Sequence, residues 1–225
     1  MKRRDFLTGG LVAGAAALVR PGAARDNLVR PEIPLRARNV IFYAYDGFSW
    51  QDFARAQHYA SRIQHRTLAI ERLFALGVAG NQTTHSLASI VTDSAAASTA
   101  WATGRKAIND YLSMYPDGRK LTTILESAQD AGKATGLITT TRVTHATPAG
   151  FAVHVASRGE EDDIALAYLA FRPDVMLGGG ARHFDAASRA DTRDLFGDFR
   201  SRGYDVLRTS NELSAASGSR LLGAF

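Results

Sequence analysis

The sequence VTDSAAAS, residues 91–98, places an acid and a hydroxyl directly before a run of alanines. The alanine-rich stretch 92–104 predicts a helix that begins near Ser94 and ends at Gly104. Unpaired amide groups at the start of a helix favour an anion, so they would stabilise a serine alkoxide and a phosphate group together. Because no His or Lys flanks Ser94, a metal ion is the expected activator of its hydroxyl. The alternative is that Asp93 or Ser94 only caps the helix.

A second acid, Asp46, follows the apolar run 39–45. A carboxylate directly after a buried strand can hold a hard cation or zinc at the edge of a sheet, although an Asp-Gly turn would look the same. Further along, the sequence THATP contains His145 and Thr147. A threonine hydroxyl can bind magnesium, and an imidazole suits zinc or a metal-bound water. Alternatively, Thr147 caps a helix that begins at Pro148.

Arg158 ends the stretch FAVHVASR and offers a guanidinium fork that matches two oxygens of a phosphate group. An arginine at a helix end also interacts favourably with the helix dipole without any further function. The other histidines show no ligand spacing, and we interpret them as structural or surface residues: His58, His65, His85, His154 and His183.

The elements that must position these residues alternate along the chain. Strands are predicted at 39–47, 133–141, 173–180 and 203–209, with a further candidate at 86–91. Helices are predicted at 53–64, 92–104, 122–132, 148–158 and 161–171. This alternation is typical of an α/β fold with a largely parallel sheet. Asp46 and the loops THATP and GGGAR follow strands, so we expect them at the carboxyl ends where sites form.

The N-terminus resembles an export signal over residues 1–24. The pair Arg3–Arg4 precedes the apolar run 9–19, which is too short to span a bilayer, and small residues follow it. We therefore predict Tat export to the periplasm or the medium, with no stable membrane anchor. The signal would carry +3 of the net charge of +5, which leaves +2 for residues 25–225 and no reason to expect a nucleic-acid partner. The chain has no cysteine, so it forms no disulfide.

Four segments together resemble the alkaline phosphatase family. VTDSAAASTAWATG is similar to the nucleophile motif of that family and the helix that follows it. TTTRVTHATPAGFAVHVASR is similar to its magnesium-threonine loop and its phosphate-binding arginine. The Asp-Gly pair after the first predicted strand and the run DVMLGGGARHF complete the set in the family order. The resemblance implies a three-layer α/β sandwich of the alkaline phosphatase type around a largely parallel central sheet.

The resemblance implies phosphomonoester hydrolysis through three residues. Ser94 would be the catalytic nucleophile, which attacks phosphorus and carries the phosphoryl group as phosphoserine. Arg158 would bind the substrate by clamping its nonbridging oxygens, and Asp93 would orient Arg158. The substrates would be small phosphomonoesters.

The resemblance also implies two zinc ions and one magnesium ion as cofactors. Asp46 would bridge the magnesium and one zinc, and Ser94 would itself be a metal ligand. Thr147 would bind magnesium, with His145 in or near that site. The second zinc would stabilise the leaving alkoxide and then deliver hydroxide to the phosphoserine.

The sequence departs from the family pattern. Tyr45 stands before Asp46 where the family often has a small residue, and SAAAST replaces SAASAT. The second half of the family domain carries further ligands in Asp-x-x-x-His and Asp-His motifs, and this sequence contains neither motif. We therefore expect residues 25–225 to be the N-terminal portion of an alkaline phosphatase domain, with the fold incomplete in this chain.

Three hypotheses about function follow. The first is a metal-dependent phosphomonoesterase; the second is an inactive or split-gene fragment that acts only with a separately encoded C-terminal half; the third is a related phosphodiesterase or a sulfatase-like enzyme. Sulfatases use a modified cysteine and the phosphodiesterases often use threonine, so Ser94 favours the phosphatase. A homodimer is also compatible with the sequence. We expect little or no turnover from the 225 residues alone.

Overall fold

The computed structural model describes residues 37–78 and 80–225. The chain falls into two compact units, Met1–Ala44 and Tyr45–Phe225, and every described helix and strand belongs to the second. The predicted export signal, residues 1–24, lies outside the described residues. Among the helices that the structure describes, none is long and apolar enough to cross a membrane.

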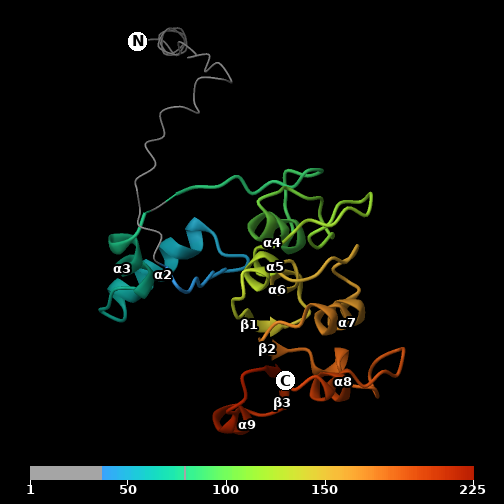
Figure 1. Ribbon diagram of the computed structural model, residues 1–225. Helices are drawn as coiled ribbons and strands as arrows, with labels where there is room; N and C mark the ends of the chain where they lie inside the picture. Colours follow the sequence, from blue (N-terminus) through green and yellow to red (C-terminus); the bar gives the residue numbers. More distant parts are fainter. Residues whose placement is uncertain (1–36, 79) are drawn as a thin grey trace, which may run out of the picture. The chain divides into compact units, whose positions relative to one another are not determined.

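The second unit is built on a four-stranded sheet in which all three neighbouring pairs are parallel (Figure 1). In sheet order the strands are β1 (Gly136–Arg142), β2 (Val175–Gly179), β4 (Leu221–Ala224) and β3 (Asp205–Leu207). Parallel neighbours need crossover connections, and helices supply them: α7 (Glu161–Phe171), α8 (Leu195–Ser201) and α9 (Ser210–Ala215). The predicted α/β fold with a parallel central sheet is confirmed.

The remaining helices are α2 (Trp50–Arg62), α3 (Ala69–Leu76), α4 (Ser94–Thr103), α5 (Ile124–Asp130), α6 (Ala146–Ala149) and the short 3₁₀ helix η1 (Ala181–His183). The bounds of α4 follow from its two ends. The Asp93 carboxylate accepts the Ala96 N–H at the first turn, and Gly104 ends the helix with a φ of 68°. Glycine adopts this left-handed conformation without a steric cost, so the predicted helix is confirmed close to its predicted bounds.

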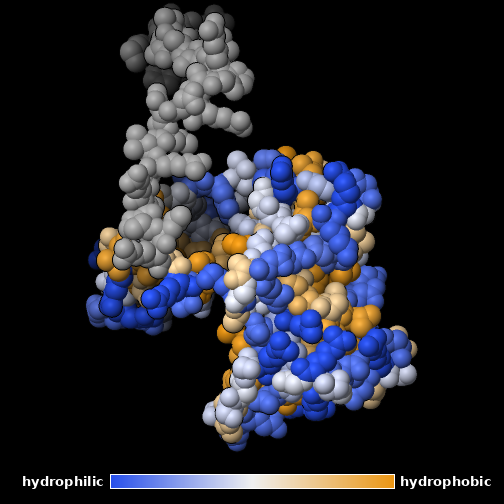
Figure 2. Space-filling view, viewed as in Figure 1, coloured by the Kyte–Doolittle hydropathy of each residue, from blue (hydrophilic) through white to orange (hydrophobic). Residues whose placement is uncertain are grey.

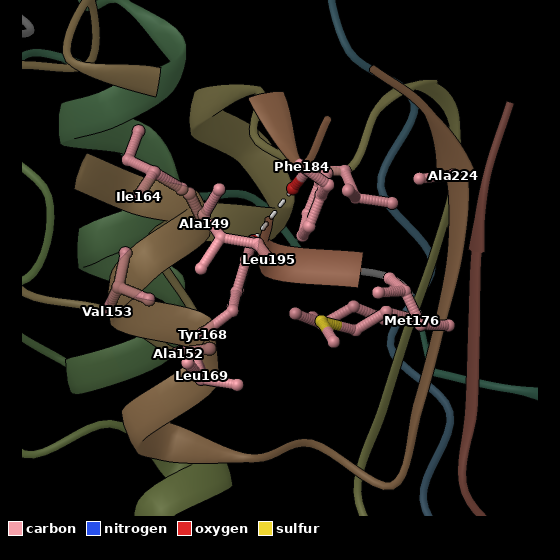
Figure 3. Packing of buried hydrophobic residues seen from close by; sticks show 14 of the residues in the cluster. Ala149, Ala152, Val153, Ile164, Tyr168, Leu169, Met176, Phe184, Leu195 and Ala224 are labelled. Carbon is pink, nitrogen blue, oxygen red and sulfur yellow. Dashed lines mark hydrogen bonds between the residues drawn. The ribbon is translucent and has the colours of Figure 1, made fainter. Parts of the chain in front are cut away.

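The hydrophobic core lies between the sheet and the helices that cover it. Met176 of β2 and Leu222 of β4 are register partners, and both are fully buried. Figure 3 shows Ile164 and Tyr168 of α7 on the helical side of the strand that carries Met176. The Tyr168 hydroxyl donates a hydrogen bond to the Val143 carbonyl at 2.8 Å, so this buried phenol is satisfied and ties α7 to the turn after β1.

Strand β1 buries only one of its faces. Leu137 points into the core, whereas Ile138, which must point to the opposite face, is 75% exposed. Hydrophobic patches also reach the surface elsewhere on the face shown in Figure 2. Trp50 and Leu73 are among the large hydrophobic residues with exposed side chains.

Two predicted strands are wrong. The first, residues 39–47, contains no strand, and Val40 and Ile41 are 80% and 86% exposed. A strand needs a neighbour for its backbone groups, and none of the described strands pairs with this run. The candidate at 86–91 consists of bends in which the buried Ser86 hydroxyl accepts a backbone N–H, so its apolar residues do not form a ladder.

The predicted helix at 148–158 is also wrong beyond its first turn. α6 is a single turn, and Gly150 lies so close to α4 that a Cβ atom there would overlap the Ser98 hydroxyl. The chain then extends, and Val155 pairs with a residue before α5 in an antiparallel bridge. This extended return, rather than a helix, carries Arg158.

The helix predicted at 161–171 is confirmed with the same ends as α7, and the other predicted elements are confirmed with shifted ends: α2, α5, β1, β2 and β3. Five of the described elements were not predicted: α3, α8, α9, β4 and the 3₁₀ helix η1. α9 has a capping box in which the Thr209 hydroxyl and the Glu212 carboxylate exchange hydrogen bonds with backbone amides. That pattern could have located this helix from the sequence.

Candidate functional site

Ser94 is the first residue of α4, but the cap of the helix is Asp93. The Asp93 carboxylate already accepts the Ala96 N–H at 2.8 Å, so the Ser94 hydroxyl is not needed as the cap. The hydroxyl instead donates to the Asp46 carboxylate, with its Oγ 3.0 Å from Oδ2. The helix has ten residues, so its free amide groups and the positive end of its dipole lie next to this hydroxyl.

The same carboxylate accepts a second hydroxyl. Thr147 Oγ1 donates to Asp46 Oδ2 at 2.7 Å. Asp46 lies in an Asp-Gly turn in which Gly47 has a φ of 66°. The turn does not exclude a functional role, because the Asp46 carboxylate is still free to accept both hydroxyls. The N-cap of α6 is His145, so the alternative in which Thr147 only caps the helix is wrong. Hydroxyls from α4 and α6 thus converge on one acid.

The Asp46 carboxyl is held in its ionised form. Partial burial alone would raise the pKa of Asp46 from its ordinary value of 3.8. The hydrogen bonds from Thr147 and Ser94, with the positive charge of nearby basic side chains, outweigh that effect and lower the pKa. A carboxylate with a lowered pKa is a weak base. Asp46 is therefore better suited to binding a cation than to removing the Ser94 proton.

Arg158 is joined to this group through Asp93. Its Nη1 lies 3.3 Å from Asp93 Oδ2, and its backbone N–H donates to the Asp110 carbonyl at 2.8 Å. The Asp110 N–H in turn donates to Asp93 Oδ2 at 3.0 Å. Asp93 therefore caps α4 and orients Arg158 at once. The Arg158 side chain remains 29% exposed, so its guanidinium can also contact a ligand from solvent.

His145 lies beside Arg158, with His145 Nε2 and Arg158 Nη2 3.1 Å apart. A guanidinium only donates, so Nε2 accepts and the imidazole is neutral at that nitrogen. Burial and the Arg158 charge both lower the pKa of His145, which agrees with a neutral ring. The structure thus brings together Ser94, Asp46 and Thr147, links Asp93 to Arg158, and places His145 against Arg158.

The oxygen atoms around Asp46 fit a hard cation. One carboxylate and the hydroxyls of Ser94 and Thr147 lie within hydrogen-bonding distance, and magnesium prefers such oxygen ligands. Across residues 37–78 and 80–225, no group of three or more His, Cys, Asp or Glu side chains could hold a metal ion. The described residues therefore fit part of a magnesium site. They do not by themselves make the two zinc sites that the sequence resemblance implied.

Sequence reasoning missed the loop that supports Asp93. The Asn109 side chain accepts the Asp93 N–H at 3.3 Å and donates to the Val91 carbonyl at 3.1 Å. Asp110 follows it with a φ of 80°, a conformation that Asp adopts more readily than most residues. The Asn-Asp pair is typical of a turn, and that was the one available signal.

The remaining histidines lie where structural or surface residues are expected. His58, His65 and His85 are exposed. His154 contacts Glu126 at 2.9 Å, and the buried His183 lies between two acids of α7. In the described structure, none of these rings forms a hydrogen bond with the Asp46 cluster, which consists of Asp46, Ser94 and Thr147.

Comparison with known proteins places the fold. The sequence model of the family described as alkaline phosphatase matches residues 37–225, which is most of the chain. The chain belongs to the alkaline phosphatase family. The crystal structure of alkaline phosphatase from Thermus thermophilus is 49% identical with a TM-score of 0.78, over 81% of this chain and 38% of that one.

Curated relatives from the alkaline phosphatase family agree with this assignment. Streptomycin-6-phosphate phosphatase of Streptomyces griseus is 37% identical over 96% of this chain and 54% of its own length. Alkaline phosphatase of Escherichia coli K12 is 31% identical over 95% of this chain and 53% of its own length. The chain therefore spans about half the length of these relatives. A variant of the TAB5 alkaline phosphatase with Mg bound, 27% identical with a TM-score of 0.65, matches 75% of this chain and 47% of that one.

Proposed function

We propose that this chain supplies the phosphoryl-accepting part of a metal-dependent phosphomonoester hydrolase. The observation that carries the proposal is the Ser94 hydroxyl at the N-terminus of α4, hydrogen-bonded to Asp46 at 3.0 Å. Its neighbour Asp93 holds Arg158 at the same helix end. Membership of the alkaline phosphatase family supports the proposal, since the relatives are named as phosphatases.

In the proposed reaction, the Ser94 oxygen attacks phosphorus as the bond from phosphorus to the ester oxygen breaks. The Ser94 hydroxyl releases its proton to solvent, and the leaving alkoxide takes up one proton from solvent and departs as the alcohol. Water then attacks the phosphoserine, which releases inorganic phosphate and restores the hydroxyl. The amide groups at the start of α4 stabilise the phosphoryl oxygens. The Arg158 fork binds two of those oxygens, and Asp93 keeps the guanidinium oriented.

Asp46, Thr147 and Ser94 would hold the cations, with magnesium at Asp46 and Thr147 and zinc at Asp46 and Ser94. When bound, such cations favour ionisation of the serine hydroxyl and neutralise the charge on the leaving oxygen. Asp46 keeps both hydroxyls directed to one point and stays ionised because its pKa is lowered. The remaining ligands for two zinc ions and one magnesium would come from outside the described residues, in a C-terminal half.

The substrate class we propose is a small phosphomonoester. One relative is named for streptomycin 6-phosphate, which is a monoester of this kind. The serine at the helix start supports a monoesterase over a diesterase, because the related phosphodiesterases often use threonine as the nucleophile.

We also propose Tat-dependent export, which rests on the pattern of residues 1–24. Replacing both arginines of the pair, Arg3→Lys with Arg4→Lys, is expected to retain the protein in the cytoplasm of a Tat-competent host. Cell fractionation measures this. Unchanged export of the double variant would contradict the proposal.

The nucleophile is tested by trapping the phosphoenzyme. The protein is loaded with zinc and magnesium, supplied with the C-terminal part of the Thermus thermophilus alkaline phosphatase, given a labelled phosphomonoester and quenched in acid. We expect the label on Ser94 by mass spectrometry and its loss in Ser94→Ala. Ser98→Ala is the matched control, because the Ser98 hydroxyl lies in the same helix but donates to the Ala146 carbonyl.

Two outcomes of this experiment would contradict different parts of the proposal. Normal turnover in Ser94→Ala would refute the nucleophile. Without the added C-terminal part we expect little or no turnover, so rapid hydrolysis by the chain alone would refute our count of the metal ligands.

A further inference from the structure

Residues 142–147, from the last residue of β1 to the second residue of α6, form a turn that carries two candidate site residues, His145 and Thr147. Its backbone is closed by one hydrogen bond, from the His145 N–H to the Arg142 carbonyl at 2.9 Å. The direction of the Thr147 hydroxyl therefore depends on what else holds this turn. Within the site, the His145 ring accepts the Thr147 N–H at 3.4 Å, and a further side chain that holds the turn comes from outside the site.

Glu161, the first residue of α7, contacts the turn at two points. Its Oε2 accepts the Thr144 hydroxyl at 2.6 Å. Both of its carboxylate oxygens accept from Arg142 Nε, at 3.0 and 2.7 Å. Thr144 is fully buried and directly precedes His145, while Arg142 is the last residue of β1. One carboxylate thus holds the start and the middle of the turn together.

This use of Glu161 differs from ordinary helix capping. A carboxylate in a first turn commonly accepts a backbone N–H of its own helix end. Glu126 does so, because it accepts the Thr123 N–H at 2.7 Å in the capping box of α5. The hydrogen bonds of Glu161 go instead to side chains of the 142–147 turn. The position of Glu161 at a helix start does not explain this arrangement.

The 3₁₀ helix η1, which follows β2, brings His183 to the same Glu161 oxygen that accepts from Thr144 and Arg142. His183 is 4% exposed, and its Nε2 lies 3.1 Å from Glu161 Oε2. Its Nδ1 lies 2.8 Å from Asp162 Oδ1, and its Nε2 also accepts from Arg182 Nε at 3.3 Å, so three neighbouring side chains hold the ring. The chain passes close to the turn at Gly180, where a Cβ atom would lie 3.0 Å from that of Arg142. The glycine run DVMLGGG therefore lets His183 reach Glu161.

We propose that Glu161, supported by His183, is a positioning residue that fixes the 142–147 turn and so directs the Thr147 hydroxyl at Asp46. Glu161 acts through Thr144 and Arg142. The inference rests on the proposed function, because it takes the Asp46 cluster to be a metal site. Outer partners that orient metal ligands typically change metal affinity by about 10–100-fold.

The test compares Glu161→Gln with the matched control Glu126→Gln. Each substitution replaces a partly buried carboxylate beside a histidine with an amide of the same shape. Only Glu161 contacts the 142–147 turn. Mn²⁺, a magnesium substitute with a paramagnetic resonance signal, is titrated into the protein. We expect Mn²⁺ affinity to fall about tenfold in Glu161→Gln and to stay within about twofold in Glu126→Gln.

Thr144 provides a second pair of variants. Thr144→Val removes the hydroxyl at nearly the same volume, whereas Thr144→Ser keeps it. We expect the valine variant to lose Mn²⁺ affinity and the serine variant to retain it. Hydrogen exchange should show faster exchange of the amides of residues 143–149 in Glu161→Gln and Thr144→Val, and no such change in Glu126→Gln and Thr144→Ser. A loss of global stability would instead speed exchange across the whole core.

Equal Mn²⁺ affinities in Glu161→Gln and Glu126→Gln would overturn the proposal. So would the same loss of affinity in Thr144→Ser and Thr144→Val. Either result leaves the proposed function intact if Ser94 is still phosphorylated. An Asp46→Asn variant that binds Mn²⁺ as tightly as the parent would refute the metal site, and both proposals would then fail together.

Discussion

The Thr147 hydroxyl lies 2.7 Å from the Asp46 carboxylate, although 101 positions separate the two residues in the sequence. This contact joins the loop before α2 to the first turn of α6. Ser94 adds a hydroxyl from a third element, α4. The three oxygen donors therefore depend on the packing of separate segments, so each can be tested by a change that leaves the others in place.

Removal of the Thr147 hydroxyl is expected to weaken magnesium binding. Thr147→Val keeps the branched shape and removes one oxygen donor, so the affinity for Mg²⁺ should fall by about tenfold or more in calorimetric titration. Thr103→Val is the control, because that hydroxyl donates to the Thr99 carbonyl at the other end of α4. Unchanged affinity in Thr147→Val would remove Thr147 from the ligand set.

Arg158→Lys keeps the positive charge but loses the planar fork. Two parallel hydrogen bonds to phosphate become one, so inhibition by inorganic phosphate should weaken by about tenfold, or about 1.4 kcal/mol. The inhibition constant measures this in the zinc- and magnesium-loaded protein supplied with the C-terminal part. Arg119→Lys, at an exposed pair with Asp117, should have no effect. Equal phosphate inhibition in both variants would contradict the role of Arg158.

Gly150→Ala should destabilise the fold by about 1–3 kcal/mol, because overpacking costs energy of this order. The added methyl would overlap the Ser98 hydroxyl, which donates to the Ala146 carbonyl at 2.9 Å. Thermal or urea unfolding measures the change. Gly159→Ala is the matched control, since its nearest neighbour would lie at an ordinary 3.4 Å. If both variants unfold alike, α4 and α6 are not packed as closely as described.

The ion pair of Asp191 with the buried Arg189 predicts a pH-dependent stability. Its hydrogen bond from Arg189 lowers the pKa of Asp191 from 3.8 to about 2. A carboxyl group whose pKa is lower in the folded than in the unfolded protein stabilises the folded state at pH values above the unfolded pKa. For Asp191 this stabilisation is lost as the pH falls from 3.8 towards 2. Asp191→Asn should therefore be less stable than the parent at pH 7, and the difference should narrow below about pH 4. Urea midpoints across pH measure it; a constant difference would contradict the assignment.

Local signals in the sequence predicted the elements that are specified locally. The helix from Ser94 was found because Asp93 and Gly104 mark its ends, and α7 because its first turn is acidic. The apolar run 39–45 was misread because a strand also depends on a partner, which the run itself does not encode. Strand β4 was missed for the converse reason, since LLGA is short and its strand character comes from β2 and β3 on either side.

The candidate site also contains features that the sequence predicted and features that depend on the fold. The types of Ser94, Asp46 and Arg158 suggested phosphate chemistry, and the resemblance to a family made that suggestion specific. The support given by Asn109 to Asp93, and by Glu161 to the 142–147 turn, could not be read from the sequence. Both supports join residues that only the fold brings together. An acid in a first turn, such as Glu161, is explained equally well by the helix dipole when only its local sequence is considered.

The order of strands in the sheet has a consequence for synthesis on the ribosome. β4 follows β1, β2 and β3 in the sequence, yet it lies between β2 and β3 in the sheet. Until Leu221–Ala224 has left the exit tunnel, β3 has no hydrogen-bonding neighbour among the strands that the structure describes, and Met176 of β2 lacks its partner Leu222. The nascent chain must therefore hold β3 as an unpaired segment, and a chaperone that binds extended hydrophobic segments would find it exposed at that stage.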